Sequence, residues 1–188
     1  MTAIRLIRLA RRRSSRAKGD SGAVLIEFAI TFPLLVVLLL GMFTGGLAWN
    51  QKLAATNGVR EGSRFGATLA VTSSSCTAGS GTLNCWLKQV ADITQLSSEG
   101  ELGSTVASRR ICVAYVSSGT GATDQTMSLI RTASGDSITG TPCFADGRPA
   151  TERRVQVTGS RQSTIEFLVF ALTPTLSTES VTKFESSL

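Results

Sequence analysis

The sequence contains no histidine among its 188 residues, and charged side chains make up only 17% of it. The absence of histidine excludes Ser-His-Asp and Cys-His catalysis and every His-ligated metal site. The acidic side chains beyond the N-terminal segment are scattered in expected turns, loops or exposed helix positions. They include Asp92, Asp124, Asp136, Asp146, Glu99 and Glu101. We therefore expect no enzyme, no metal and no cofactor.

The net charge of +6 is confined to the start of the chain. Residues 1–22 contain seven of the 19 basic side chains and one of the 13 acidic ones, so the remaining residues contain twelve of each sign. A basic globular domain that binds nucleic acid is therefore excluded. Abundant Gly, Ser and Thr favour instead an exported domain rich in strands and turns.

A long run without charge follows this basic leader. Residues 28–50 span 23 positions with no charged side chain, which as a helix would extend about 35 Å and cross a bilayer core. The positive-inside rule places residues 1–22 in the cytoplasm and the chain beyond about residue 51 outside, and Trp49 lies where an interfacial aromatic belongs. We predict a single-pass transmembrane helix over 23–50.

Two other interpretations of this run remain open. A buried helix of a soluble protein could be equally apolar, although length, flanking charge and the aromatic edge all favour a membrane span. A cleavable signal peptide would use the small residues Gly46 and Ala48, but the apolar part of such signals is only about 7–15 residues long.

Glu27 is the one acidic residue among apolar neighbours at the start of the run. A carboxylate within the hydrocarbon costs about 2.5–3.5 kcal/mol, so it normally has a partner and a function. Lys18 is nine residues upstream, too far for one helical turn. Cleavage between Gly22 and Ala23 would create an α-ammonium four residues before Glu27, where the two charges face each other on a helix. The alternative is an interfacial Glu27 that reaches the lipid head groups.

The stretch Gly22-Ala-Val-Leu-Ile-Glu27-Phe28 resembles the processing site of type IV pilin-like proteins, in which Pro33 is also a common feature of the helix. The resemblance is closest to the TadE-like family, the minor pilins or pseudopilins of the tight-adherence (Flp) pilus system. It is carried by Glu27-Phe28-Ala29, the leucine-rich run at 34–40 and the AATNGVREGSRFGA block at 54–67. It covers about residues 19–70.

The resemblance implies a non-enzymatic minor pilin, processed after Gly22 by a prepilin peptidase and involved in adherence. Its implied partners are the major Flp-type pilin, other minor pilins and the inner-membrane Tad assembly platform. Its implied location is the cell membrane, with a cytoplasmic N-terminus and possible incorporation into an extracellular pilus. The alternatives are an unprocessed, membrane-anchored binding protein, a domain secreted after cleavage at Ala48, and an exported enzyme.

Residues 51–72 are expected to continue the helix as a stalk, which the Ser73-Ser74-Ser75 run would end. Gly58, Gly62 and Gly66 recur every four residues and share one helix face, where small residues permit close approach of another helix. This face is expected to pack either on neighbouring subunits or on the head domain of the same chain. Pro33 and the glycines of the span permit bending.

Residues 73–188 are expected to form the extracytoplasmic head, which contains all four cysteines. An even number of cysteines in an oxidising compartment favours disulfides, and of three possible pairings we prefer Cys76–Cys85 and Cys112–Cys143. Zinc is disfavoured because the chain has no CxxC pair and no histidine.

The head is expected to contain one short helix over 83–96 and an antiparallel sheet of about four strands, which together give an α+β, pilin-like fold class. The segment from Ser163 to Thr173 is apolar on both faces, which is typical of a central strand. Turns are expected at 119–121, 135–136, 139–142 and 146–149. The expected strands cover 110–117, 126–132, 153–159, 163–173 and 180–184.

Overall fold

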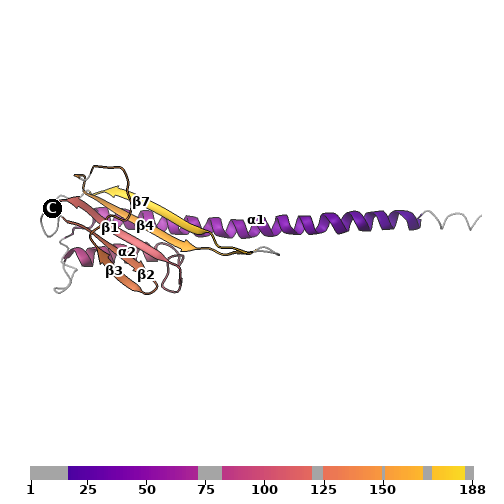
Figure 1. Cartoon of the computed structure of the whole chain (residues 1–188), viewed down its shortest axis with the longest axis horizontal. Coiled ribbons are helices and arrows are strands. Elements are labelled where there is room, and N and C mark those ends of the chain that lie inside the picture. The colour runs from indigo at the N-terminus through magenta and orange to yellow at the C-terminus, as the bar shows by residue number, and fades with distance from the viewer. Residues whose placement is uncertain (1–16, 72–81, 120–124, 150, 167–170, 185–188) are drawn as a thin grey trace, which may run out of the picture.

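A computed structural model describes residues 17–71, 82–119, 125–149, 151–166 and 171–184. One long helix, α1 (Ala17–Thr68, 52 residues), carries a head at its C-terminal end (Figure 1). At 1.5 Å per residue α1 is about 78 Å long. Its N-terminal half has no covering element among the described residues, whereas its C-terminal half is one layer of the head. The predicted α+β fold class is confirmed.

The helix α1 is continuous through the predicted cleavage site and the predicted kink. Gly22 lies inside it, and it continues through Pro33 to end at Thr68, a few residues before the predicted end of the stalk. The backbone N–H of Leu69 still donates to the Phe65 carbonyl at 3.0 Å, and the Trp86 indole N–H donates to the Leu69 carbonyl at 3.2 Å. A core side chain thus satisfies a carbonyl at the helix end.

The head consists of α2 (Thr82–Leu96) and a five-stranded antiparallel sheet in the order β3-β2-β1-β4-β7. Its strands are β1 (Arg110–Ser118), β2 (Gln125–Thr132), β3 (Gly135–Thr139), β4 (Arg154–Gln162) and β7 (Thr175–Lys183). A separate two-stranded hairpin joins β5 (Ile165–Glu166) to β6 (Ala171–Leu172). The predicted short helix and three of the predicted strands match these elements closely, and the prediction at 180–184 covers the end of β7.

Two expectations about the sheet are wrong. Residues 163–173 do not form a central strand: the chain leaves the sheet at Ser163, folds back as β5 and β6, and re-enters it at β7. The central position belongs to β1, in which seven consecutive residues are buried. The error arises because an apolar run indicates apolar surroundings but does not distinguish the centre of a sheet from another apolar environment.

The other error concerns β3, which lies where the sequence indicates turns. Gly135 begins β3 with φ of 134°, a conformation that favours glycine, and pairs with Thr132 across a two-residue connection. Asp136 therefore belongs to a strand. The main sheet has five strands instead of about four because this short, polar edge strand lacks the apolar alternation on which strand prediction depends.

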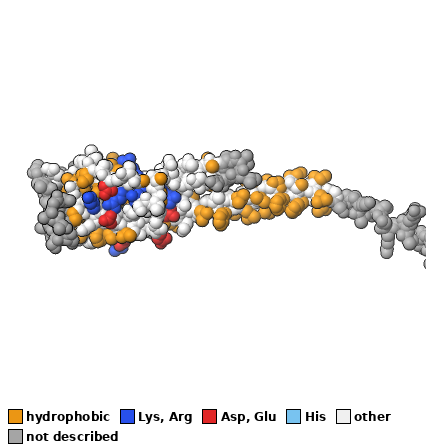
Figure 2. Space-filling view, turned by 90° about the horizontal axis from the view of Figure 1, so that it is seen from below, with side chains coloured by type: hydrophobic (Ala, Val, Ile, Leu, Met, Phe, Trp, Pro, Cys, Tyr) orange, Lys and Arg blue, Asp and Glu red, His pale blue; other side chains and the backbone are white. Residues whose placement is uncertain are grey.

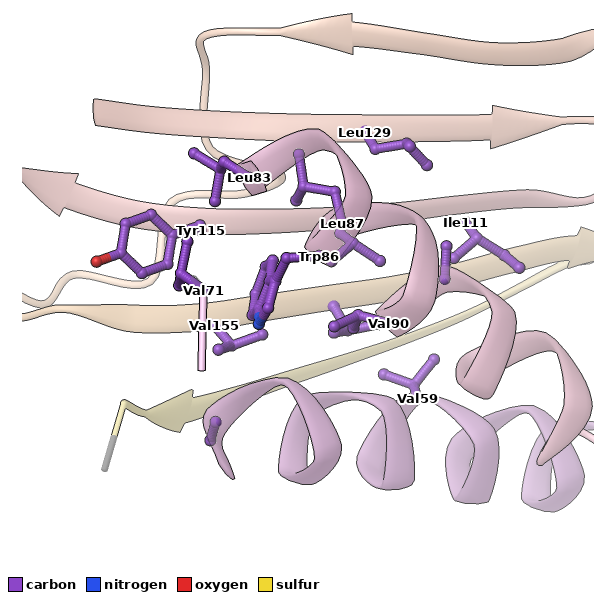
Figure 3. Packing of buried hydrophobic residues seen from close by; sticks show 14 of the residues in the cluster. Val59, Val71, Leu83, Trp86, Leu87, Val90, Ile111, Tyr115, Leu129 and Val155 are labelled. Atoms are coloured by element: carbon purple, nitrogen blue, oxygen red, sulfur yellow. The ribbon is translucent and has the colours of Figure 1, made fainter. Parts of the chain in front are cut away.

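The hydrophobic core lies between the helices and one face of the sheet. The helix α1 contacts β4 and β7, and α2 contacts β1 and β2, so the two helices divide this face between them. Figure 3 shows Trp86 and Val90 of α2, Val59 of α1 and Val155 of β4 converging in this layer. Trp86 is 1% exposed, which identifies it as a core anchor, as the sequence suggested.

The opposite face of the sheet is covered by an irregular segment, residues 140–149. It is tied to β1 by the Cys112–Cys143 disulfide, with a Cα–Cα distance of 5.8 Å. The fully buried Gln156 of β4 accepts a hydrogen bond from the Cys143 N–H at 3.1 Å and donates one to the Phe144 carbonyl at 3.0 Å. This cover explains why β1 is buried on both faces.

Candidate processing and assembly site

The candidate cleavage site lies near the start of α1. Gly22 and Ala23 are both exposed, and a Cβ added at Gly22 would have no described atom within 4 Å. The bond between them is therefore not covered by any described part of the head. It lies within six residues of the first described residue of the helix. Residues 1–16 of the predicted leader lie outside the described residues.

Glu27 lies four residues after Ala23 on the same continuous helix. No ion pair involves Glu27 within the described part of the chain. Its backbone carbonyl accepts a hydrogen bond from the Thr31 hydroxyl at 2.9 Å. A cut between Gly22 and Ala23 would place an α-ammonium across one helical turn from the Glu27 carboxylate.

The residues after Glu27 form an exposed apolar surface around α1. Phe28 and Phe32 stack on each other with ring centroids 5.2 Å apart, yet each is more than half exposed. The helix from Gly22 to Thr68 contains a stretch long and apolar enough to cross a membrane, and none of that stretch is buried. Figure 2 shows this hydrophobic surface along the part of α1 that projects from the head. The N-terminal part of α1 is thus a candidate membrane anchor.

The stalk glycines lie against the head of the same chain, which is the second of the two arrangements considered from the sequence. A Cβ at Gly58 would lie 2.6 Å from the Thr94 carbonyl oxygen, and a Cβ at Gly62 would overlap the Thr94 hydroxyl. A Cβ at Gly66 would lie 3.1 Å from Trp86, Val90 and Val155. The glycines therefore allow α1 and α2 to approach closely within one subunit.

The opposite face of the stalk is free for other contacts. It consists of side chains at helical spacing that are exposed in the isolated subunit. They are Leu53, Asn57, Arg60, Glu61, Arg64 and Thr68. Any lateral contact of the stalk with a neighbouring chain would therefore use this face and not the glycine face.

An ion pair in the head is more buried than the sequence suggested. Asp146, expected in a turn, accepts hydrogen bonds from the Arg154 guanidinium at 2.6 and 2.9 Å, and both side chains are at most 7% exposed. Burial alone raises the pKa of Asp146. Hydrogen bonds from Gln156, the Arg148 N–H and Arg154, together with the Arg154 charge, outweigh burial and hold this pKa below its ordinary value.

This cluster fastens the 140–149 segment to β4. Asp92 and Asp136 pair with Arg131, and Glu101 pairs with Arg161. These carboxylates therefore belong to structural ion pairs, which spacing along the chain does not reveal. Asp124 lies outside the described residues. Among the described side chains, no group of three His, Cys, Asp or Glu residues could hold a metal ion.

The Cys112–Cys143 pairing predicted from the sequence is confirmed. Cys85 is also disulfide-bonded. Cys76, its predicted partner, lies outside the described residues.

Comparison with known proteins bears on the N-terminal part of the chain. Residues 22–64 match the family of TadE-like proteins. No curated protein and no solved structure matches the chain. The matched segment begins at the candidate cleavage site, includes the exposed apolar half of α1 and ends in the stalk at Arg64. The resemblance found in the sequence is thereby confirmed for this segment, and the chain carries a TadE-like region from residue 22 to residue 64.

Proposed function

We propose that this protein is a minor pilin, or pseudopilin, that functions in the biogenesis, tip or base of a Tad (Flp) type IV pilus and in adherence. The TadE-like match supports association with a Tad pilus. The observation that best supports the more specific proposal, a processed minor pilin, is the position of Glu27. It lies at the start of an exposed apolar helix, has no ion-pair partner among the described residues and follows Ala23 by four positions.

Processing after Gly22 would supply the missing partner and remove the basic leader. The new ammonium of Ala23 would neutralise Glu27 across one helical turn, at the end of the helix where a carboxylate also suits the helix dipole. The mature helix would then begin without the seven cations that hold residues 1–22 on the cytoplasmic side. An apolar helix freed in this way can leave the bilayer and pack among other apolar helices in a fibre.

The implied partners have separate roles. A prepilin peptidase would act at Gly22-Ala23, and the inner-membrane assembly platform would extract the processed helix. The major Flp-type pilin and other minor pilins would cover the bare half of α1. A structural, non-enzymatic head is consistent with the ion pairs that hold Asp136, Asp146 and Glu101.

The deciding experiment is mass analysis of the N-terminus of the protein isolated from cells that make the pilus. We expect a mature chain that starts at Ala23. The Gly22→Ala variant should keep its leader, because the peptidase would no longer find glycine before the cut bond. Gly45→Ala, a glycine substitution elsewhere on the exposed helix, is the matched control and should be processed normally.

Glu27→Ala separates processing from assembly. We expect this variant to be cleaved more readily than it is assembled, because the carboxylate is needed mainly after the cut. Shearing of pili followed by blotting would show its loss from the fibre fraction. An intact leader on the wild-type chain would instead support an unprocessed, membrane-anchored binding protein, and a chain starting at Trp49 would indicate a signal peptide.

A further inference from the structure

The β5–β6 hairpin lies apart from the main sheet, at the end of the head from which α1 projects. Figure 1 shows the coloured segments that directly follow β4 and precede β7 extending past the end of the sheet and along α1. The strand β5 contacts α1 directly. The base of the hairpin is closed by a hydrogen bond of 3.0 Å from the Ser163 N–H to the Pro174 carbonyl. A second membrane-proximal element thus accompanies the helix.

One hydrogen bond fixes the height of this hairpin relative to the apolar span. The Ser163 hydroxyl, which is buried, donates to the side-chain oxygen of Gln51 at 2.7 Å. Gln51 directly precedes Lys52, the first charged side chain after Glu27. With about 30 Å of hydrocarbon to cross at 1.5 Å per residue, the span needs about 20 residues, so Gln51 lies at the level of the lipid head groups. The hairpin begins at that level and continues toward the bilayer.

The hairpin exposes apolar side chains, as an element at the level of the lipid head groups requires. Leu172 is 51% exposed and Ala171 is also exposed, while Ile165 is partly buried. Ile165 and Leu172 are directly paired across the two strands. From residue 164 to residue 173 the sequence contains a single charge, Glu166. In an aqueous environment the exposed Leu172 side chain would be unfavourable, since an apolar side chain in water forgoes the free energy of burial.

The depth of the hairpin is limited by its backbone. A two-stranded hairpin has two open edges, and unpaired N–H and C=O groups are not tolerated in hydrocarbon. The three residue-to-residue steps from Ser163 to Glu166 extend about 10 Å at 3.3 Å per step, comparable with the 5–10 Å to which interfacial elements bury their apolar side chains. The geometry therefore suits insertion into the interface and not a second crossing.

We infer that strand β6 of the hairpin inserts its exposed Ala171 and Leu172 side chains into the lipid leaflet from which α1 emerges, and that this contact sets the height of the head above the membrane. The inference rests on the membrane placement of α1 in the proposed function. The occupant of this surface is lipid, because the hairpin continues the apolar surface of α1 at the level where the span ends. The Ser163–Gln51 hydrogen bond links the two membrane elements rigidly.

The test places a fluorescent label on the hairpin of the full chain. Leu172→Cys is labelled with an environment-sensitive nitrobenzoxadiazole group, which is selective because none of the described cysteines is free. The labelled protein is reconstituted into phosphatidylcholine vesicles with and without doxyl-labelled lipid. We expect a blue-shifted emission, loss of emission with doxyl lipid and protection from aqueous iodide. Ala171→Cys provides a second labelling position on the same strand.

Two labels provide matched controls. Ile138→Cys lies on β3, the sheet edge farthest from α1, and is 44% exposed, so it should be quenched by iodide and not by lipid. Val37→Cys lies in the middle of the apolar span and should be quenched by doxyl lipid.

The inference is overturned if position 172 behaves as position 138 does while position 37 is quenched by lipid. Protection of position 172 from iodide without quenching by lipid would place the hairpin against another protein chain, and also overturns it. If position 37 too escapes the lipid quencher, the membrane placement of α1 fails and the proposed function fails with it. The two failures are therefore distinguishable.

Discussion

At the scale of single residues, the Asp146–Arg154 pair shows how one buried interaction holds the outer cover of the sheet. Arg154 also donates to the Pro149 carbonyl at 2.8 Å, so the pair joins β4 to the segment that contains Cys143 and Asp146. Removing one charge would leave the other buried without a partner. Such losses cost far more than the loss of an exposed pair.

We expect Asp146→Asn to lower the free energy of unfolding of the full chain in detergent by about 3 kcal/mol. Urea unfolding followed by the fluorescence of the buried Trp86 measures the change. The matched control is Asp136→Asn, which weakens the more exposed pair with Arg131 and should cost less than about 1 kcal/mol. Equal effects of the two substitutions would contradict the structural role of Asp146.

The same residue predicts a dependence on pH. Because the pKa of Asp146 is lowered on folding, its contribution to stability is complete above the unfolded value of about 3.9. That contribution is lost as the pH falls through the lower folded value. Acid unfolding of the wild-type chain should therefore be steeper below pH of about 4 than that of Asp146→Asn.

At the scale of elements, the contact between α1 and α2 depends on glycine. Gly58→Ala would place a Cβ 2.6 Å from the Thr94 carbonyl oxygen and 2.9 Å from the Ser98 nitrogen, both backbone atoms of the other segment that cannot rotate away. We expect an overpacking cost of about 1–3 kcal/mol, which exceeds the gain of about 1 kcal/mol in helix propensity. Urea unfolding in detergent tests this, with Gly45→Ala as the control that meets no neighbour. A stabilised Gly58→Ala head would contradict the observed packing.

The elements differ in how far the sequence predicted them. The helix α2 shows apolar residues at helical spacing, β1 is rich in apolar and β-branched residues, and Val155-Gln156-Val157 of β4 alternates, so local patterns were sufficient. The segment at 163–173 has the apolar content of a central strand but lies outside the main sheet, because its surroundings depend on contacts with distant Gln51 and with the base of the hairpin. The edge strand β3 pairs only with β2 and has a polar sequence, so no local pattern distinguished it from a turn.

At the scale of the whole molecule, the core and the membrane surface occupy different halves of the same helix. Among the side chains of α1 whose burial the structure describes, buried residues begin at Ala54, and those from residue 22 to residue 53 are exposed or only partly buried. A chain that starts at Gln51 should therefore keep the whole core and lose the apolar span. We expect this fragment to keep the helical and sheet circular-dichroism spectrum of the head and to be monomeric in size-exclusion chromatography in mild detergent. Loss of that spectrum would contradict the independence of the core from the apolar span.

The sequence by itself determined the properties that depend on neighbouring residues. The basic leader, the uncharged span, the Gly22–Glu27 spacing and the amphipathic α2 are all local, since charge, hydropathy and helical spacing act over a few residues. Only the tertiary structure decided the order of the strands, the glycine contact with α2, the burial of Asp146 and the position of the β5–β6 hairpin. These depend on which distant segments meet, and the free energy of such contacts is set by the packing of the whole chain and not by any short stretch of it.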